Sequence, residues 1–205
     1  MLLLRFIRLT RLVWLLPVLV SGCTVLPSNE AGGGDAVALA PPAAQTQYEQ
    51  AVSAMAAGDV VEAELRFSEF QLRYPDYPGA HVNLAILQSR AGDDSKAEAS
   101  IEHALQLKPD HAAALNQLGM LRRRQGRFAD AETAYLAALA AEPGYRLAHY
   151  NLGVLNELYL QRLAPALDHY QKYQGLGASD QRVEKWIVDL KRRIAASQRT
   201  ANVTE

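Results

Sequence analysis

The feature that most constrains this chain is a sequence unit written twice in tandem over residues 78–145. The first copy carries His81, Leu84, Ala85, Gly92, Ala97, Ile101, Ala104 and Pro109. The second carries Leu115, Leu118, Gly119, Gly126, Ala131, Tyr135, Ala138 and Pro143, each 34 positions after its counterpart. A fixed period of this length is the signature of a repeat architecture, in which each unit buries its apolar face only by stacking on its neighbours.

The same frame extends in both directions. One period upstream lie Ala51, Gly58, Ala63, Phe67 and Pro75. One period downstream, Leu152 and Gly153 repeat Leu118 and Gly119, but Ala166 and Tyr170 match Ala131 and Tyr135 only with one extra residue. We therefore predict units at 44–77, 78–111, 112–145 and 146–179, the last of which is irregular.

The residue types predict two amphipathic helices in each unit. Gly58, Gly92 and Gly126 lie where the first helix ends, and glycine tolerates the left-handed conformation of a helix C-terminus. Ala85, Gly119 and Gly153 are small because two helices cross closely there. Prolines end the second helix and turn the chain into the next unit.

The pattern Leu115-x-x-Leu118-Gly119, followed by Ala131-x-x-x-Tyr135 and closed by Pro143, resembles the tetratricopeptide repeat (TPR) family. The resemblance implies an all-α fold, a TPR α-solenoid of about four helix-turn-helix repeats. Apolar residues at helical spacing after Asp180 predict a C-terminal capping helix over residues 180–197, started by Ser179 or Asp180. We expect residues 198–205 to be a disordered tail.

The N-terminus has the layout of a signal peptide over residues 1–22. Three arginines precede an apolar run from Leu12 to Val20, which is too short to span a bilayer as a helix. The run ends in Val20-Ser21-Gly22-Cys23, which resembles the lipobox of bacterial lipoproteins, and Cys23 is the only cysteine in the chain. The resemblance implies acylation of Cys23, and the alternative is an ordinary signal peptide with an incidental cysteine.

Residue 24 is threonine, and the absence of aspartate there implies, within the lipoprotein family, transport to the Gram-negative outer membrane. The expected location is its periplasmic face. Glycines and prolines without apolar periodicity predict a flexible linker over residues 23–43. The protein would therefore be tethered to the membrane through its N-terminal lipid anchor.

No motif in the sequence predicts catalysis, a cofactor or a metal site. The five histidines form no i, i+4 pair on one helix and have no cysteine partner. Without the three arginines of the signal peptide, 18 basic residues face 22 acidic ones, a net charge of −4. This charge gives no general reason to bind nucleic acid.

TPR proteins usually bind a protein or peptide in the groove lined by the first helix of each unit. Carried over position by position, the resemblance implies a partner-binding groove formed by Tyr48, Val52, Met55, Val82, Ile86, Asn116, Met120, Arg123, Tyr150, Val154 and Glu157. Part of this set is expected to belong to helix packing instead. The run Arg122-Arg123-Arg124 predicts either a solvated helix end or a basic spot for an anionic partner.

These features predict a non-enzymatic scaffold or adaptor. The architecture resembles that of TPR lipoproteins that support assembly of type IV or tight-adherence pili and related secretion systems. An alternative is an adaptor for periplasmic proteases or cell-wall hydrolases, and a further one is an enzyme or transport component with an unrecognised site.

Overall fold

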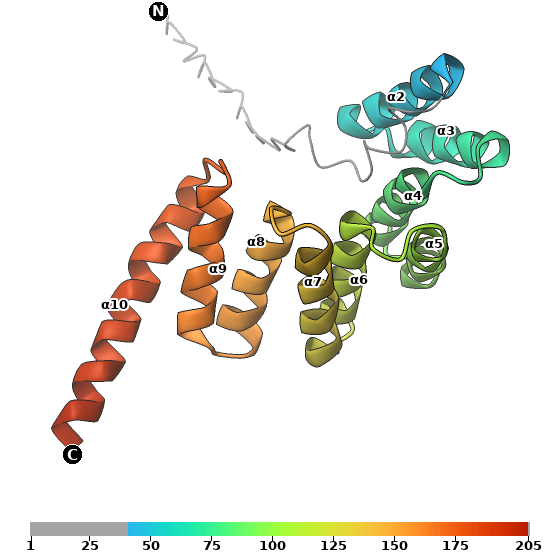
Figure 1. The fold of residues 1–205 in the computed structure, drawn as a ribbon. Coiled ribbons are helices and arrows are strands. Elements are labelled where there is room, and N and C mark those ends of the chain that lie inside the picture. The colour runs from blue at the N-terminus through green and yellow to red at the C-terminus, as the bar shows by residue number, and fades with distance from the viewer. Residues whose placement is uncertain (1–40, 205) are drawn as a thin grey trace, which may run out of the picture.

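The computed structural model describes residues 41–204, with side chains described as far as residue 199. The predicted signal peptide (1–22), Cys23 and the linker up to residue 40 lie outside this range. Helix labels follow Figure 1 and begin at α2.

All regular secondary structure within residues 41–204 is helical. In chain order the elements are α2 (Pro42–Ala57), α3 (Val60–Arg73), α4 (Pro78–Arg90), α5 (Asp94–Leu107), α6 (Ala112–Arg124), α7 (Phe128–Ala141), α8 (Arg146–Val154), the π-helix η1 (Leu155–Tyr159), α9 (Leu163–Gly175) and α10 (Gln181–Thr204).

The helices pack in the order of the sequence. We call α2, α4, α6 and α8 the A helices, and α3, α5, α7 and α9 the B helices; each A helix packs on the following B helix, and α10 packs on α9. The pairs follow one another in an arc from α2 to α10 (Figure 1), and the predicted all-α solenoid of four helix pairs with a capping helix is confirmed. Because α4 also packs on α6, and α6 on α8, the A helices form the inner wall of the arc.

The turn between helices A and B requires a left-handed residue. Gly58, Gly92 and Gly126 have φ angles of 80°, 82° and 76°, so the prediction that glycine ends helix A is confirmed. In the fourth unit this place is taken by Gln161, the only non-glycine residue with positive φ in the described part of the chain, at 54°. A side chain there costs conformational energy that glycine avoids.

The extra residue of the fourth unit lies in a π-helix. Leu155 follows Leu121 by 34 positions, but Gln161 follows Gly126 by 35, and η1 lies between them. A π-turn accommodates one added residue inside a helix. It leaves Leu158 and Tyr159 with 65% and 45% of their surface exposed.

The helix crossings explain the small residues of helix A. A Cβ on Gly119 would lie 2.5 Å from Cδ1 of Tyr135, and one on Gly153 would lie 2.4 Å from Cε1 of Tyr170. In the second unit alanine is tolerated as Ala85, because the helix B residue that it meets is the smaller Ile101. A small residue on helix A therefore faces a larger one on helix B, so the space between the two helices of a unit is filled.

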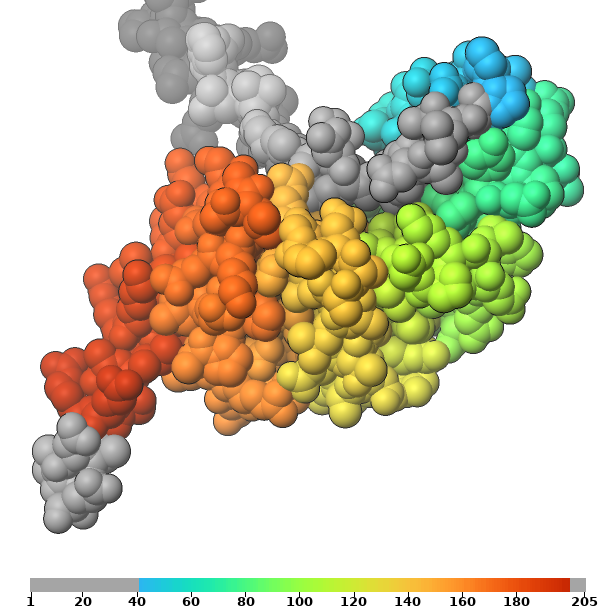
Figure 2. All heavy atoms as spheres, in the orientation of Figure 1, coloured from blue at the N-terminus to red at the C-terminus, as the bar shows by residue number. Residues whose placement is uncertain are grey.

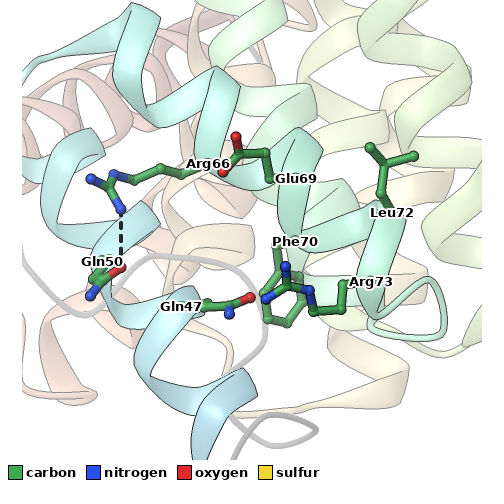
Figure 3. Close-up of a pocket in the computed structure, with 7 residues that line it drawn as sticks. All are labelled: Gln47, Gln50, Arg66, Glu69, Phe70, Leu72 and Arg73. Carbon is green, nitrogen blue, oxygen red and sulfur yellow. Dashed lines mark hydrogen bonds between the residues drawn. The ribbon is translucent and has the colours of Figure 1, made fainter.

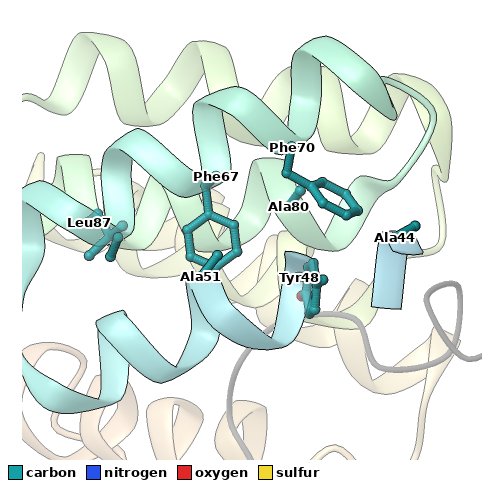
Figure 4. Packing of buried hydrophobic residues seen from close by; sticks show 8 residues of the cluster. Ala44, Tyr48, Ala51, Phe67, Phe70, Ala80 and Leu87 are labelled. Atoms are coloured by element: carbon teal, nitrogen blue, oxygen red, sulfur yellow. The ribbon is translucent and has the colours of Figure 1, made fainter. Parts of the chain in front are cut away.

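Both ends of the solenoid have aromatic cores. At the N-terminal end Tyr48 meets Phe67 and Phe70 edge-on, with ring centroids 5.8 and 5.5 Å apart, and Leu87 of α4 closes the cluster (Figure 4). At the C-terminal end Val183, Ile187 and Leu190 of α10 bury themselves against the fourth unit. This is the role expected of a capping helix, which covers the last apolar face.

Helix α10 is longer than predicted. It runs to Thr204, so the predicted disordered tail is corrected for residues 198–204. No glycine or proline interrupts residues 181–204, and each residue added to an existing helix gains a backbone hydrogen bond. No helix between residues 41 and 204 carries an apolar stretch of the length needed to cross a bilayer.

Candidate interaction surface on the A helices

The residues predicted to bind a partner all lie on the A helices or on η1, the continuation of α8. Figure 2 shows the units as successive bands of one continuous surface between α2 and α10. Whether each predicted residue can reach a partner depends on how the next unit covers it, so the exposure of each side chain decides its role.

Burial removes part of the predicted groove. Val82 and Asn116 are fully buried and Tyr48 exposes 6% of its surface, so these three residues cannot contact a partner in this structure. Ile86 and Val154 expose only 9% each. The prediction that these side chains line an open groove is therefore corrected, because they pack between units.

Hydrogen bonds between successive A helices explain this burial. The side-chain amide of Asn83 donates to the Tyr48 hydroxyl at 2.8 Å, and that of Asn151 donates to Oδ1 of Asn116 at 2.9 Å. Each bond joins two residues 35 apart, one from each of two A helices. Buried polar side chains are stable when paired in this way, and the pairing fixes how one A helix sits on the next.

Five of the remaining predicted residues keep access to solvent, and they are Val52, Met55, Met120, Arg123 and Tyr150. Met120 is the exposed apolar side chain among them, with 36% of its surface exposed. The sixth, Glu157, exposes only 12% of its side chain and is paired with Arg193 of α10. Tyr150 also has a packing role, because its ring lies 5.3 Å from that of Tyr173 and 6.2 Å from that of Trp186.

Two of the three arginines in the run 122–124 are paired with side chains of the preceding unit. Arg122 pairs with Glu98 at 2.5 Å, and Arg124 pairs with Asp94 and donates to the Ser89 hydroxyl at 2.7 Å. These bonds tie α6 to the preceding unit. Arg123 differs, because its guanidinium lies over the Tyr159 ring at 5.8 Å and no acidic residue within the described part of the chain pairs with it. Of the run, Arg123 is thus the cation left for a partner.

Tyr159 is a surface residue that the sequence prediction missed. It lies between Arg123 and Phe128, whose ring centroid is 4.8 Å from its own. The π-helix turns it toward the end of α6. The one-residue slip in register was the only sequence signal for this local change.

Four of the five histidines form two pairs, each across the A and B helices of its own unit. Nδ1 of His149 lies 3.1 Å from Nδ1 of His169, and the rings of His81 and His103 stack at 4.2 Å. Because Nε2 of His149 faces the Pro143 carbonyl at 3.3 Å, that nitrogen carries the proton and Nδ1 accepts from His169.

The imidazoles of the His149–His169 pair are held neutral near pH 7. Burial lowers the pKa of both His149 and His169, and that of His169 falls to about 4 with a further contribution from the neighbouring His149. Over the described residues, no group of three or more histidine, cysteine, aspartate or glutamate side chains is placed to hold a metal ion.

A recess between α2 and α3 has a volume of about 590 Å³ (Figure 3). It is lined by Gln47, Gln50, Arg66, Glu69, Phe70, Leu72 and Arg73. Arg66 donates to Gln50 at 3.0 Å and pairs with Glu62 at 2.6 Å.

In a comparison with protein families, the tetratricopeptide repeat family matches residues 37–115 and 116–181 of the chain. No curated protein sequence matches the chain significantly. Solved structures do. PilF of Pseudomonas aeruginosa is 22% identical with a TM-score of 0.66, and the match covers 77% of this chain and 72% of PilF.

Two further structures show the same fold. MamA of Desulfovibrio magneticus is 19% identical with a TM-score of 0.59, over 79% of this chain and 91% of MamA. The first TPR of Spaghetti (RPAP3), solved with the HSP90 peptide SRMEEVD, is 17% identical with a TM-score of 0.54, over 58% of this chain and 95% of that one. At these identities the likeness concerns the fold alone.

Proposed function

The chain belongs to the tetratricopeptide repeat family, and from that premise we propose that it is a non-enzymatic scaffold that binds a protein segment along its A helices. The observation that carries the proposal is the row of side chains that packing leaves accessible on the inner wall. Met120 and Arg123 of α6 are central to it. An exposed methionine beside an arginine suits an amphipathic segment, since methionine adapts to irregular apolar surfaces and arginine is enriched at binding hot spots.

The second part of the proposal is a lipid anchor. It rests on the sequence: an apolar run ends in Ser21-Gly22-Cys23, and the chain has no other cysteine. Acylation of Cys23 would tether the solenoid to the periplasmic face of the outer membrane. One acyl chain alone gives only marginal membrane binding, whereas the two or more chains of a lipoprotein hold it stably.

The third part is a role in assembling an envelope complex, such as a type IV or tight-adherence pilus or a secretion system. It is supported by the likeness of the fold to PilF and, separately, by the lipoprotein-like N-terminus of this chain. The specific complex would be named by the proteins that copurify with the wild-type chain.

Two matched substitutions test the scaffold. Met120→Glu places a charge on the inner wall, and Leu136→Glu places the same charge on helix B at a residue with 49% of its surface exposed. We expect Met120→Glu to abolish recovery of the copurifying proteins after crosslinking in cells and Leu136→Glu to retain it, with equal helicity by circular dichroism. Equal recovery with both variants would place the partner surface elsewhere.

The anchor is tested separately by Cys23→Ser and cell fractionation. The variant should be absent from the outer-membrane fraction, and the wild-type protein should incorporate labelled palmitate. A Cys23→Ser protein that still fractionates with the outer membrane would contradict the lipid anchor without bearing on the scaffold.

A further inference from the structure

Two tyrosines occupy equivalent places in the third and fourth units. Tyr135 on α7 and Tyr170 on α9 are 35 residues apart, which is one period plus the extra residue in η1. Each ring packs against the glycine of its own helix A, Gly119 or Gly153. Their hydroxyl groups therefore point to equivalent positions, one helical turn further along helix A.

In the fourth unit the hydroxyl of Tyr170 is hydrogen-bonded to a carboxylate that is itself paired. Tyr170 donates to Oε2 of Glu157 at 3.2 Å, and Oε1 of the same carboxylate accepts from Arg193 of α10 at 2.8 Å. The Glu157 side chain exposes only 12% of its surface. A carboxylate is thus held between a phenol and a guanidinium inside the chain.

In the third unit the same arrangement lacks its carboxylate. The residue equivalent to Glu157, 34 positions earlier, is Arg123. Tyr135 is fully buried, and within the described residues its hydroxyl has no hydrogen-bond partner. A buried donor of this kind is rarely left unpaired in a folded protein.

Arg123 lies near enough to Tyr135 for its charge to act on the pKa of that phenol, and its guanidinium is the second donor group of this position. Its guanidinium lies over the Tyr159 ring, which leaves the N–H groups at its edge free to turn toward an acceptor. Burial raises the pKa of Tyr135 to about 12, so the phenol stays protonated and can donate near neutral pH.

We propose that Tyr135 and Arg123 form a subsite for one carboxylate, contributed by a glutamate or aspartate side chain of the bound protein segment. The carboxylate would accept from both donors, as Glu157 accepts from two donors in the next unit. Because the Tyr135 hydroxyl is closed off from solvent in this structure, the partly exposed Arg123 side chain would have to turn aside as the carboxylate enters. Met120, one turn earlier on α6, and the exposed Leu158 and Tyr159 would contact apolar residues beside the acidic one. The inference rests on the proposed scaffold function and names the chemistry that its inner wall selects.

The test uses the purified full chain and a peptide probe, acetyl-Leu-Glu-Leu-amide, whose only charge is the glutamate side chain. Nuclear magnetic resonance would follow the side-chain Nε–Hε of Arg123 and the ring signals of Tyr135. We expect saturable shifts with this peptide and none with acetyl-Leu-Gln-Leu-amide at the same concentration. Equal shifts with both peptides, or no saturable shift with the glutamate peptide, would overturn the proposal.

Acetate separates a peptide site from a general anion site. If acetate alone gave the same shifts at the same concentration, the subsite would bind any small anion, and the assignment to a protein segment would fail. Weaker shifts with acetate would support the contribution of the apolar contacts around Met120.

Two tyrosine variants separate binding from folding. Tyr135→Phe removes an unpaired hydroxyl, so it should leave the melting temperature unchanged or raise it. The same variant should bind the glutamate peptide roughly tenfold more weakly, as expected for the loss of one hydrogen bond to a charged group. Tyr170→Phe removes a paired hydroxyl, so it should lower the melting temperature and leave peptide affinity unchanged. The opposite pattern would assign Tyr135 a merely structural role.

Arg123→Glu is the decisive variant. The new carboxylate would lie where Glu157 lies in the fourth unit and would accept from Tyr135 within the chain. We expect a protein at least as stable as wild type that no longer binds the glutamate peptide. Retained binding would refute the subsite, while loss of partners through Met120→Glu would still support the scaffold, so the two proposals can fail independently.

Discussion

Replacing Gly119 with alanine tests whether the crossing of α6 and α7 is as tightly packed as the structure indicates. The added Cβ would lie 2.5 Å from both Cδ1 and Cε1 of Tyr135 and 2.9 Å from Cζ. Ordinary contact begins near 3.4 Å, so the ring or the helix must move by about 1 Å. The ring is fully buried beside Leu152 and Leu155, which leaves it little room to do so.

The structure sets both the sign and the size of the effect. Overpacking a filled core costs about 1–3 kcal/mol, whereas alanine gains up to about 1 kcal/mol over glycine inside a helix. An approach of 2.5 Å places the clash in the upper part of that range, at about 2–3 kcal/mol, so after the gain Gly119→Ala should lower the free energy of unfolding by about 1–2 kcal/mol. For a chain of this size the melting temperature would fall by roughly 2–8 °C.

Gly175 provides a matched control at the end of α9. A Cβ there would meet no atom within 4 Å, so Gly175→Ala should be neutral or stabilising by up to about 1 kcal/mol. Both variants would be unfolded with urea and followed by circular dichroism at 222 nm, a wavelength characteristic of helix. The reasoning is refuted if Gly119→Ala is as stable as wild type, because the ring would then have space that the structure does not contain.

Three further substitutions test other parts of the structure. Gln161→Gly relieves the left-handed glutamine after η1 and should raise the free energy of unfolding by about 0.5–1 kcal/mol; a loss in urea unfolding would show that the conformation carries no strain. Asn151→Leu leaves Oδ1 of Asn116 buried without its donor and should cost about 1–3 kcal/mol, against a near-neutral change for the exposed Gln106→Leu. The pKa of His169 in the folded chain is about 4, below its ordinary value of 6.5. As the pH falls, this histidine is therefore protonated in the unfolded chain before it is in the folded one, so the free energy of unfolding should decrease from about pH 6.5 to about pH 4. Because His169 is partly exposed, the loss should be only about 1 kcal/mol, and His169→Gln should remove it from a series of unfolding midpoints against pH.

The sequence by itself determined the repeat period, the number of helix pairs and the ends of the A helices. These follow from local chemistry: a glycine that takes the left-handed conformation, a proline that ends a helix, and a small residue opposite a large one. The close helix crossing at Gly119 was predicted from the small residues that recur at this position, Ala85, Gly119 and Gly153. That Tyr135 packs against this glycine was seen only in the structure. Even the extra residue of the fourth unit was visible as a slip in register.

Only the tertiary structure decided which residues of the inner wall are accessible. Met120 and Val154 hold the same position in their units, yet one exposes 36% of its surface and the other 9%. Within one arginine run, Arg122 and Arg124 found acids in the preceding unit and Arg123 did not. A repeat period describes the backbone of each unit, but burial and pairing depend on the side chains that the neighbouring unit brings to the same place, and those differ from unit to unit.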